Sequence, residues 1–220
     1  IFNYSSVYDQ SNSEPLFYEE YPGSIVDVSQ LQFMLMKAEG YGYRNVAFVL
    51  DRGYFSRANI RFMDEHRFDF VIMARGVRRL VADVVESVRD KFECDRDNYV
   101  KEYGVYATTV KAKIHADDDR ERYMHVIYNA GKHTAERARV EEKIDRMERF
   151  LEIHENREVS VPGAIEDYFE LFFKDGKLIH YKPRKDVIRR ELNLSGYFVI
   201  VTSEKMTAAE AVRIYKGRDS

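Results

Sequence analysis

The chain has a single cysteine and no long apolar run. With Cys94 as its only cysteine, the chain cannot form an internal disulfide, and it fits a reducing cytoplasm. No apolar run approaches the length of a membrane span, and nothing near Ile1 has the pattern of a signal peptide. We therefore expect a cytoplasmic protein with no membrane partner. Because Ile1 is not a start methionine, we also expect the chain to be an internal piece of a longer protein.

Several common catalytic motifs are also missing. The six histidines form no H-x-x-x-H or similar pair, so with one cysteine a structural zinc site is not expected. The sequence contains no G-x-S-x-G, no Walker A motif and no dinucleotide fingerprint. The acidic triplet Asp117–Asp119 lacks the spacing of a calcium loop, and we interpret it as a solvated hairpin turn.

Charge is unevenly distributed along the chain. The formal net charge is −3, which taken alone argues against a nucleic-acid-binding protein. Residues 44–79, however, hold eight arginines against four acidic residues, a local excess of +4. A surface that contacts phosphates requires only such a local excess. A solvated helix face gives the same pattern, so both interpretations stay open.

Hydrophobic periodicity predicts an α/β protein in the first third of the chain. The apolar run at 45–50 is typical of a strand buried on both faces in the middle of an α/β sheet. Ser56 is placed to cap the helix that follows it. The order β-β-α-β-α-β is consistent with a mixed sheet flanked by helices. The predicted elements are strands at 2–8, 16–21, 45–50 and 68–73 and helices at 28–39 and 57–66.

The pattern changes after Arg75. Thr207 and Glu210 form a capping box at the start of the last helix. The long charged helix carries apolar residues at a/d spacing, namely Val140, Ile144, Met147 and Leu151. The predicted elements are helices at 77–91, 133–154, 161–173, 184–193 and 207–217 and strands within 99–114, 122–128 and 197–202.

Asp51 is the first candidate for a functional residue. An acidic residue at the carboxyl end of an apolar strand lies where open α/β sheets bind ligands, and Gly53 would let the backbone approach a substrate. A strand-ending aspartate is as often a helix cap or a turn former. Near the other end of the chain, Tyr215 and Arg218 share one helix face at i and i+3. By itself that pair is also explained as an ordinary amphipathic helix end.

Together these segments resemble the DDE transposases of insertion sequences, in the group whose RNase H-like core is interrupted by a β-rich insertion. The matches run in the family's order over nearly the whole chain, although 77–195 match only in outline. The D-R-G-Y element at Asp51–Tyr54 and the Y-x-x-R end at Tyr215–Arg218 are the most specific. The other matching segments are Pro15–Tyr18, Tyr21–Ser24 with Asp27, Phe55–Ser56, Asn59–Ile60, Phe68–Ile72 with Arg75, Gly196–Phe198 with Thr202, and Met206–Ala211.

The resemblance implies a two-metal site of which this chain holds one part. In that family three carboxylates bind two Mg²⁺ or Mn²⁺ ions, and Asp51 matches the second of them. The first would precede Ile1, and the third, a glutamate, would fall two residues beyond Ser220. Arg75 matches the arginine after the fifth strand of the family's core. The residues expected to contact DNA are Arg52, Arg75, Tyr215 and Arg218.

The implied chemistry explains why these residue types occur. Two Mg²⁺ ions activate water, and later a DNA 3′-hydroxyl, for in-line attack on a phosphodiester, and hard cations of this kind require oxygen ligands. Arginines hold the phosphates through bidentate hydrogen bonds. The expected function is DNA strand cleavage and transfer at insertion-sequence ends, with this piece inactive by itself. The partners implied are DNA, at transposon ends and target, and a second copy of the protein in the synaptic complex.

The expected architecture is an RNase H-like catalytic core with an inserted subdomain. The core is assigned to 1–75 and 206–220, and an α+β insertion to 76–205. Two other functions remain compatible with the sequence. One is an RNase H-like nuclease that does not join strands, and the other is a non-catalytic DNA-binding or interaction module.

Overall fold

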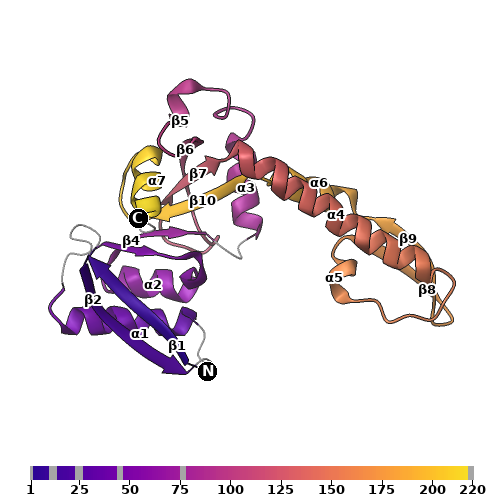
Figure 1. The fold of residues 1–220 in the computed structure, drawn as a ribbon, viewed down its shortest axis with the longest axis horizontal. Coiled ribbons are helices and arrows are strands. Elements are labelled where there is room, and N and C mark those ends of the chain that lie inside the picture. Colours follow the sequence, from indigo (N-terminus) through magenta and orange to yellow (C-terminus); the bar gives the residue numbers. More distant parts are fainter. Residues whose placement is uncertain (1, 10–13, 23–26, 44–46, 75–77, 218–220) are drawn as a thin grey trace. The chain divides into compact units, whose positions relative to one another are not determined.

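The computed structural model describes residues 2–9, 14–22, 27–43, 47–74 and 78–217 (Figure 1). Contacts divide the chain into two compact units. The first contains residues 1–127 and 198–220, and the second contains residues 128–197. None of the described helices is both long enough and apolar enough to cross a membrane.

Helices and strands alternate through most of the chain, as the periodicity predicts. The strands are β1 (Phe2–Asp9), β2 (Glu14–Pro22), β3 (Ala47–Leu50), β4 (Asp69–Met73), β5 (Tyr99–Val100), β6 (Val105–Ala112), β7 (Arg122–Tyr128), β8 (Phe169–Lys174), β9 (Lys177–Pro183) and β10 (Tyr197–Thr202). The α-helices are α1 (Asp27–Gly40), α2 (Arg57–Glu65), α3 (Arg78–Val88), α4 (Ala130–His154), α5 (Gly163–Glu166), α6 (Lys185–Asn193) and α7 (Ala208–Gly217). Two 3₁₀ helices are η1 (Arg52–Tyr54) and η2 (Arg96–Asn98).

A mixed six-stranded sheet forms the centre of the first unit. Its strand order is β3-β4-β10-β7-β6-β5, with β3 parallel to β4 and β10 antiparallel to β4. β1 and β2 pair with each other as a separate antiparallel hairpin. A mixed sheet flanked by helices is the expected fold class and is compatible with an RNase H-like fold.

The predicted position of β3 in the middle of the sheet is wrong. Among the described strands β3 stands at one end of the order, paired with β4. Only Leu50 is buried; Phe48 and Val49 are half-buried and Ala47 is exposed. A continuous apolar run indicates burial but not how many neighbours a strand has, because pairing partners come from distant parts of the chain.

The sheet of the first unit is covered by helices on both faces. Val71 of β4 belongs to a buried cluster with Ile200 of β10 and with Ala211, Val212 and Tyr215 of α7. Because side chains alternate along a strand, the neighbours of Val71 face the opposite side, and Figure 1 shows α2 and α7 on opposite sides of β4. The last helix therefore packs onto the predicted core strands, as expected from the sequence.

Both predicted capping interactions are present. The Ser56 hydroxyl accepts a hydrogen bond from the amide of Asn59 at 3.1 Å, which caps α2. Glu210 accepts from the Thr207 amide at 2.7 Å, and the Thr207 hydroxyl accepts from the Glu210 amide at 3.2 Å. Each pair satisfies backbone donors that a helix start otherwise leaves open, so the amino ends of α2 and α7 are set by local sequence.

The second unit has a helical and hairpin core of its own. Ile144 and Leu151 of α4 are buried in a cluster with Ile165, Tyr168, Phe169 and Leu178, and Val140 and Met147 pack against it, as their a/d spacing predicts. The predicted helix at 161–173 is wrong. Only Gly163–Glu166 is helical there, and Phe169–Lys174 is a strand paired with Lys177–Pro183. The turn between them is Asp175-Gly176, both with positive φ (51° and 77°), which is the signature of a tight hairpin.

The compact units have different bounds from the predicted core and insertion. β6 and β7 extend the same sheet as β4, so residues up to Ile127 group with the first unit. The assignment of 1–75 and 206–220 to a catalytic core stays a prediction about function, which these contacts do not test.

Candidate active site

Asp51 lies where the loop after β3 begins. It follows the last residue of β3, is exposed, and caps η1 by accepting a hydrogen bond from the Arg52 amide at 2.6 Å through Oδ1. β3 and β4 are parallel with Leu50 opposite Ile72, so their carboxyl ends share one edge of the sheet. Asp51 is thus at a sheet edge, as predicted, although the strand that carries it is not central.

The loop that carries Asp51 is held by hydrogen bonds from buried polar residues. The Tyr54 amide donates to the Asp51 carbonyl at 3.0 Å. The fully buried side chain of Asn59 donates to the Tyr54 carbonyl at 2.9 Å and accepts from the Gln32 amide nitrogen of α1 at 3.2 Å. Buried, fully engaged amides of this kind fix the backbone around them. The carboxylate of Asp51 therefore extends from a loop anchored to both α1 and α2.

The other predicted site residues have different environments. Arg52 is exposed next to Asp51. Tyr215 is only 2% exposed and belongs to the core cluster under α7. Its packing holds α7 on the sheet, and its expected contact with DNA stays a prediction. Arg75 and Arg218 lie outside the described residues.

The donor set does not fit two divalent metal ions. Among the described residues, no group of three or more His, Cys, Asp or Glu side chains is placed to hold a metal. Asp51 is the single carboxylate of this chain that matches the family's metal ligands. The neighbouring strand offers no substitute, because Asp69 pairs with Ala47 at the opposite end of β3 and accepts from the Ser203 hydroxyl at 3.0 Å. Two ions that each require several oxygen ligands cannot be held by one carboxylate.

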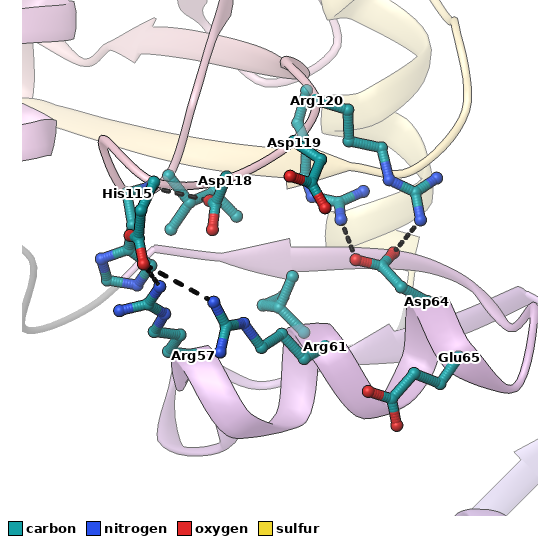
Figure 2. A pocket seen from close by; sticks show the side chains of 12 residues that line it. Arg57, Arg61, Asp64, Glu65, His115, Asp118, Asp119 and Arg120 are labelled. Atoms are coloured by element: carbon teal, nitrogen blue, oxygen red, sulfur yellow. Dashed lines mark hydrogen bonds and ion pairs between the residues drawn. The ribbon is translucent and has the colours of Figure 1, made fainter.

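A charged pocket of about 340 Å³ lies between α2 and the loop that joins β6 to β7 (Figure 2). The acidic triplet is part of this loop, and it is not merely a solvated turn as predicted. Asp117 pairs with Arg57, and its carboxylate is 3.7 Å from the guanidinium of Arg61. The hydrogen bond from Arg57 holds the pKa of Asp117 below its usual value. The sequence pattern missed this contact because α2 and the triplet are 60 residues apart.

The far side of the same pocket is built around Asp64. Its carboxylate pairs with Arg122 and lies 3.2 Å from the guanidinium of Arg120. Arg122 is 5% exposed and lies over the Phe70 ring with 5.4 Å between guanidinium and ring centre. Burial lowers the pKa of Arg122, and Asp64 opposes that effect. This buried pair connects α2 to β7, and it is a packing element more than a free cationic surface.

Two polar atoms at the pocket have no hydrogen-bond partner in the described part of the chain: Nε of Arg57 and Nε2 of His115. Buried atoms of this kind are normally satisfied by water or by a bound group. The pocket as a whole is lined by four arginines and five acidic residues, so its positive charge is neutralised internally. The arginine excess of residues 44–79 therefore does not form an open phosphate-binding surface at α2 in this arrangement.

Comparison with protein families assigns the chain. The family model described as the transposase DDE domain matches residues 2–218, and the chain belongs to that family. Family membership implies an enzyme that acts on nucleic acid in transposition. Comparisons with curated proteins and with solved structures give no match.

Proposed function

We propose that this chain is part of the catalytic domain of an insertion-sequence transposase that cleaves DNA strands and transfers them to a target. The observation that carries the proposal is Asp51, which is exposed at the carboxyl end of β3 on a loop anchored by Asn59. In this proposal Asp51 is one metal-binding carboxylate, and Arg52, Arg75 and Arg218 hold DNA phosphates. Cytoplasmic DNA is the substrate, and two copies of the protein bring the transposon ends together.

The metal site would be completed by carboxylates outside the residues present here. Mg²⁺ or Mn²⁺ would supply the activation of water and of the 3′-hydroxyl. The residues of this chain supply one charge and a fixed position for it. The chain alone is therefore expected to bind these ions weakly and to cleave no DNA.

A strand-cleavage assay with Mg²⁺ or Mn²⁺ tests the proposal. It compares this chain, a version extended at both ends, and Asp51→Ala in that version, with Asp145→Ala as a matched control because Asp145 is exposed on α4. Activity is expected only in the extended version, with loss of at least about 100-fold in Asp51→Ala and none in the control. Cleavage by the unextended chain that disappears in Asp51→Ala would show that its ligands are complete and our placement of the other two is wrong.

The products of the same assay separate the alternative functions. Joined products are expected with a target duplex present. Cleavage without joining would favour an RNase H-like nuclease instead. DNA binding without cleavage by the extended version would favour a non-catalytic module, and would refute the proposed function.

A further inference from the structure

The β8-β9 hairpin of the second unit carries exposed apolar side chains. Figure 1 shows the hairpin beside the carboxyl-terminal end of α4. Phe172, Phe173 and Ile179 are 40%, 48% and 42% exposed, although all three are large and apolar. Clustered exposed apolar groups commonly mark a binding surface.

The pairing register assigns these residues to the two faces of the hairpin. Phe169, Leu171, Leu178 and Tyr181 point into the core of the second unit. Because side chains alternate along a strand, the opposite face carries three cross-strand pairs. These pairs are Glu170 with Lys182, Phe172 with His180, and Lys174 with Lys177, and all six residues are exposed. We call these six residues the outer face.

An aromatic pair stands between basic residues on the outer face. The rings of Phe172 and His180 are stacked, with 5.6 Å between centroids and 30° between planes. The lysine pair at the turn and Lys182 on the other side are each two residues along the strand from this stack, or about 7 Å. One carboxylate, Glu170, opposes three lysines. A base stacked on the ring of Phe172 would place its phosphates within reach of lysine side chains.

The charge of the surrounding sequence supports a polyanionic ligand. Residues 169–193 contain seven Lys and Arg against four Asp and Glu, a net +3, while the whole chain has −3. Aromatic rings for stacking next to cations for the backbone are the usual means of binding single-stranded nucleic acid without sequence readout. A protein partner would use the same apolar area but would not require the planar ring.

We propose that the outer face is a stacking platform for unpaired bases, such as those of single-stranded or opened DNA ends. The proposal rests on the proposed function, since it assigns the ligand of the second unit within a DNA-processing enzyme. Phe172 stacks on a base, and Lys174, Lys177 and Lys182 contact the adjoining phosphates.

The test is binding of a labelled short oligothymidylate, and of a duplex as comparison, to the full chain by fluorescence anisotropy at low salt. Phe172→Ala is expected to weaken single-strand binding about 5- to 100-fold, and Phe172→Leu nearly as much, because leucine keeps the apolar area but has no ring face. Ile153→Ala is the matched control: Ile153 is apolar and 61% exposed but lies on α4 outside the hairpin. Lys174→Gln combined with Lys177→Gln is expected to reduce the salt dependence by about 0.7 per contact.

The outcomes distinguish this proposal from the proposed function. Equal single-strand affinity of Phe172→Ala and wild type would overturn the stacking platform only, and cleavage by the extended version that depends on Asp51 would still stand. Full affinity in Phe172→Leu would overturn it in favour of an apolar docking surface. Loss of single-strand binding in Phe172→Ala, together with an extended version that never cleaves, would overturn the proposed function only. A chain that binds no DNA at all would overturn both.

Discussion

His125 offers a direct test of the interior of the first unit. It lies on β7 with no exposed area, between Thr109 of β6 at 2.8 Å from Nδ1 and Thr202 of β10 at 3.1 Å from Nε2. The Thr202 hydroxyl donates to the Glu204 carbonyl at 2.7 Å. Thr202 must therefore accept from Nε2–H, and Nδ1 accepts from Thr109. The histidine is held as the neutral Nε2–H tautomer.

Burial lowers the pKa of His125 from 6.5 to about 4. In the unfolded chain the imidazole binds a proton below about pH 6.5, whereas the folded protein delays that binding to about pH 4. The unfolded state thus binds more protons in this window, and stability is lost as pH falls through it. A difference of about 2.5 pKa units corresponds to about 3 kcal/mol, all of it present above about pH 7 and absent near pH 4.

The measurement is the free energy of unfolding by urea at about pH 7 and about pH 4, in wild type and in His125→Gln. Carboxylates titrate in both proteins, so the difference between their pH dependences isolates the histidine. Wild type should lose about 3 kcal/mol more than the variant between the two conditions. An NMR titration gives a second readout. Ring resonances of His125 that shift with a midpoint near pH 6.5 would refute the burial-based reasoning.

Two further variants test local features of each unit. In Gly196→Ala the new Cβ would lie 2.7 Å from Cβ of His133 at a φ of +81°, so we expect a loss of about 2–4 kcal/mol in urea unfolding. Gly163→Ala, where no atom lies within 4 Å of the added Cβ, should change stability little, and equal effects of the two would contradict the steric explanation. Asp117→Asn should strengthen duplex DNA binding at low salt because it releases the two arginines of α2 from their ion pairs. Asp119→Asn makes the same charge change at an exposed position of the turn, so an equal gain there would mean that net charge alone is responsible.

The sequence by itself determined the local elements whose signals lie within a few residues. Ser56 and the Thr207–Glu210 pair predicted the starts of α2 and α7, because a capping hydrogen bond spans only three residues. The a/d spacing of Val140 to Leu151 predicted the buried face of α4. The run ending at Asp51 predicted an exposed acidic residue at a sheet edge, and the order of motifs indicated the family that the comparison assigns.

The same local reasoning failed where a single signal allowed two structures. Residues 161–173 contain apolar residues that fit a short helix as well as a strand, and the Asp175-Gly176 turn decided for the hairpin.

Only the tertiary structure decided which distant segments meet. It placed β3 at one end of the sheet, because strand neighbours are chosen by the whole fold. It brought Asp117 to Arg57 and Thr109 and Thr202 to His125, across separations of 60, 16 and 77 residues. It also buried Tyr215 beneath α7, although its position in the Y-x-x-R motif had suggested contact with DNA. Periodicity reports which face of an element is apolar; the identity of the segment that covers this face depends on long-range packing, which no local pattern encodes.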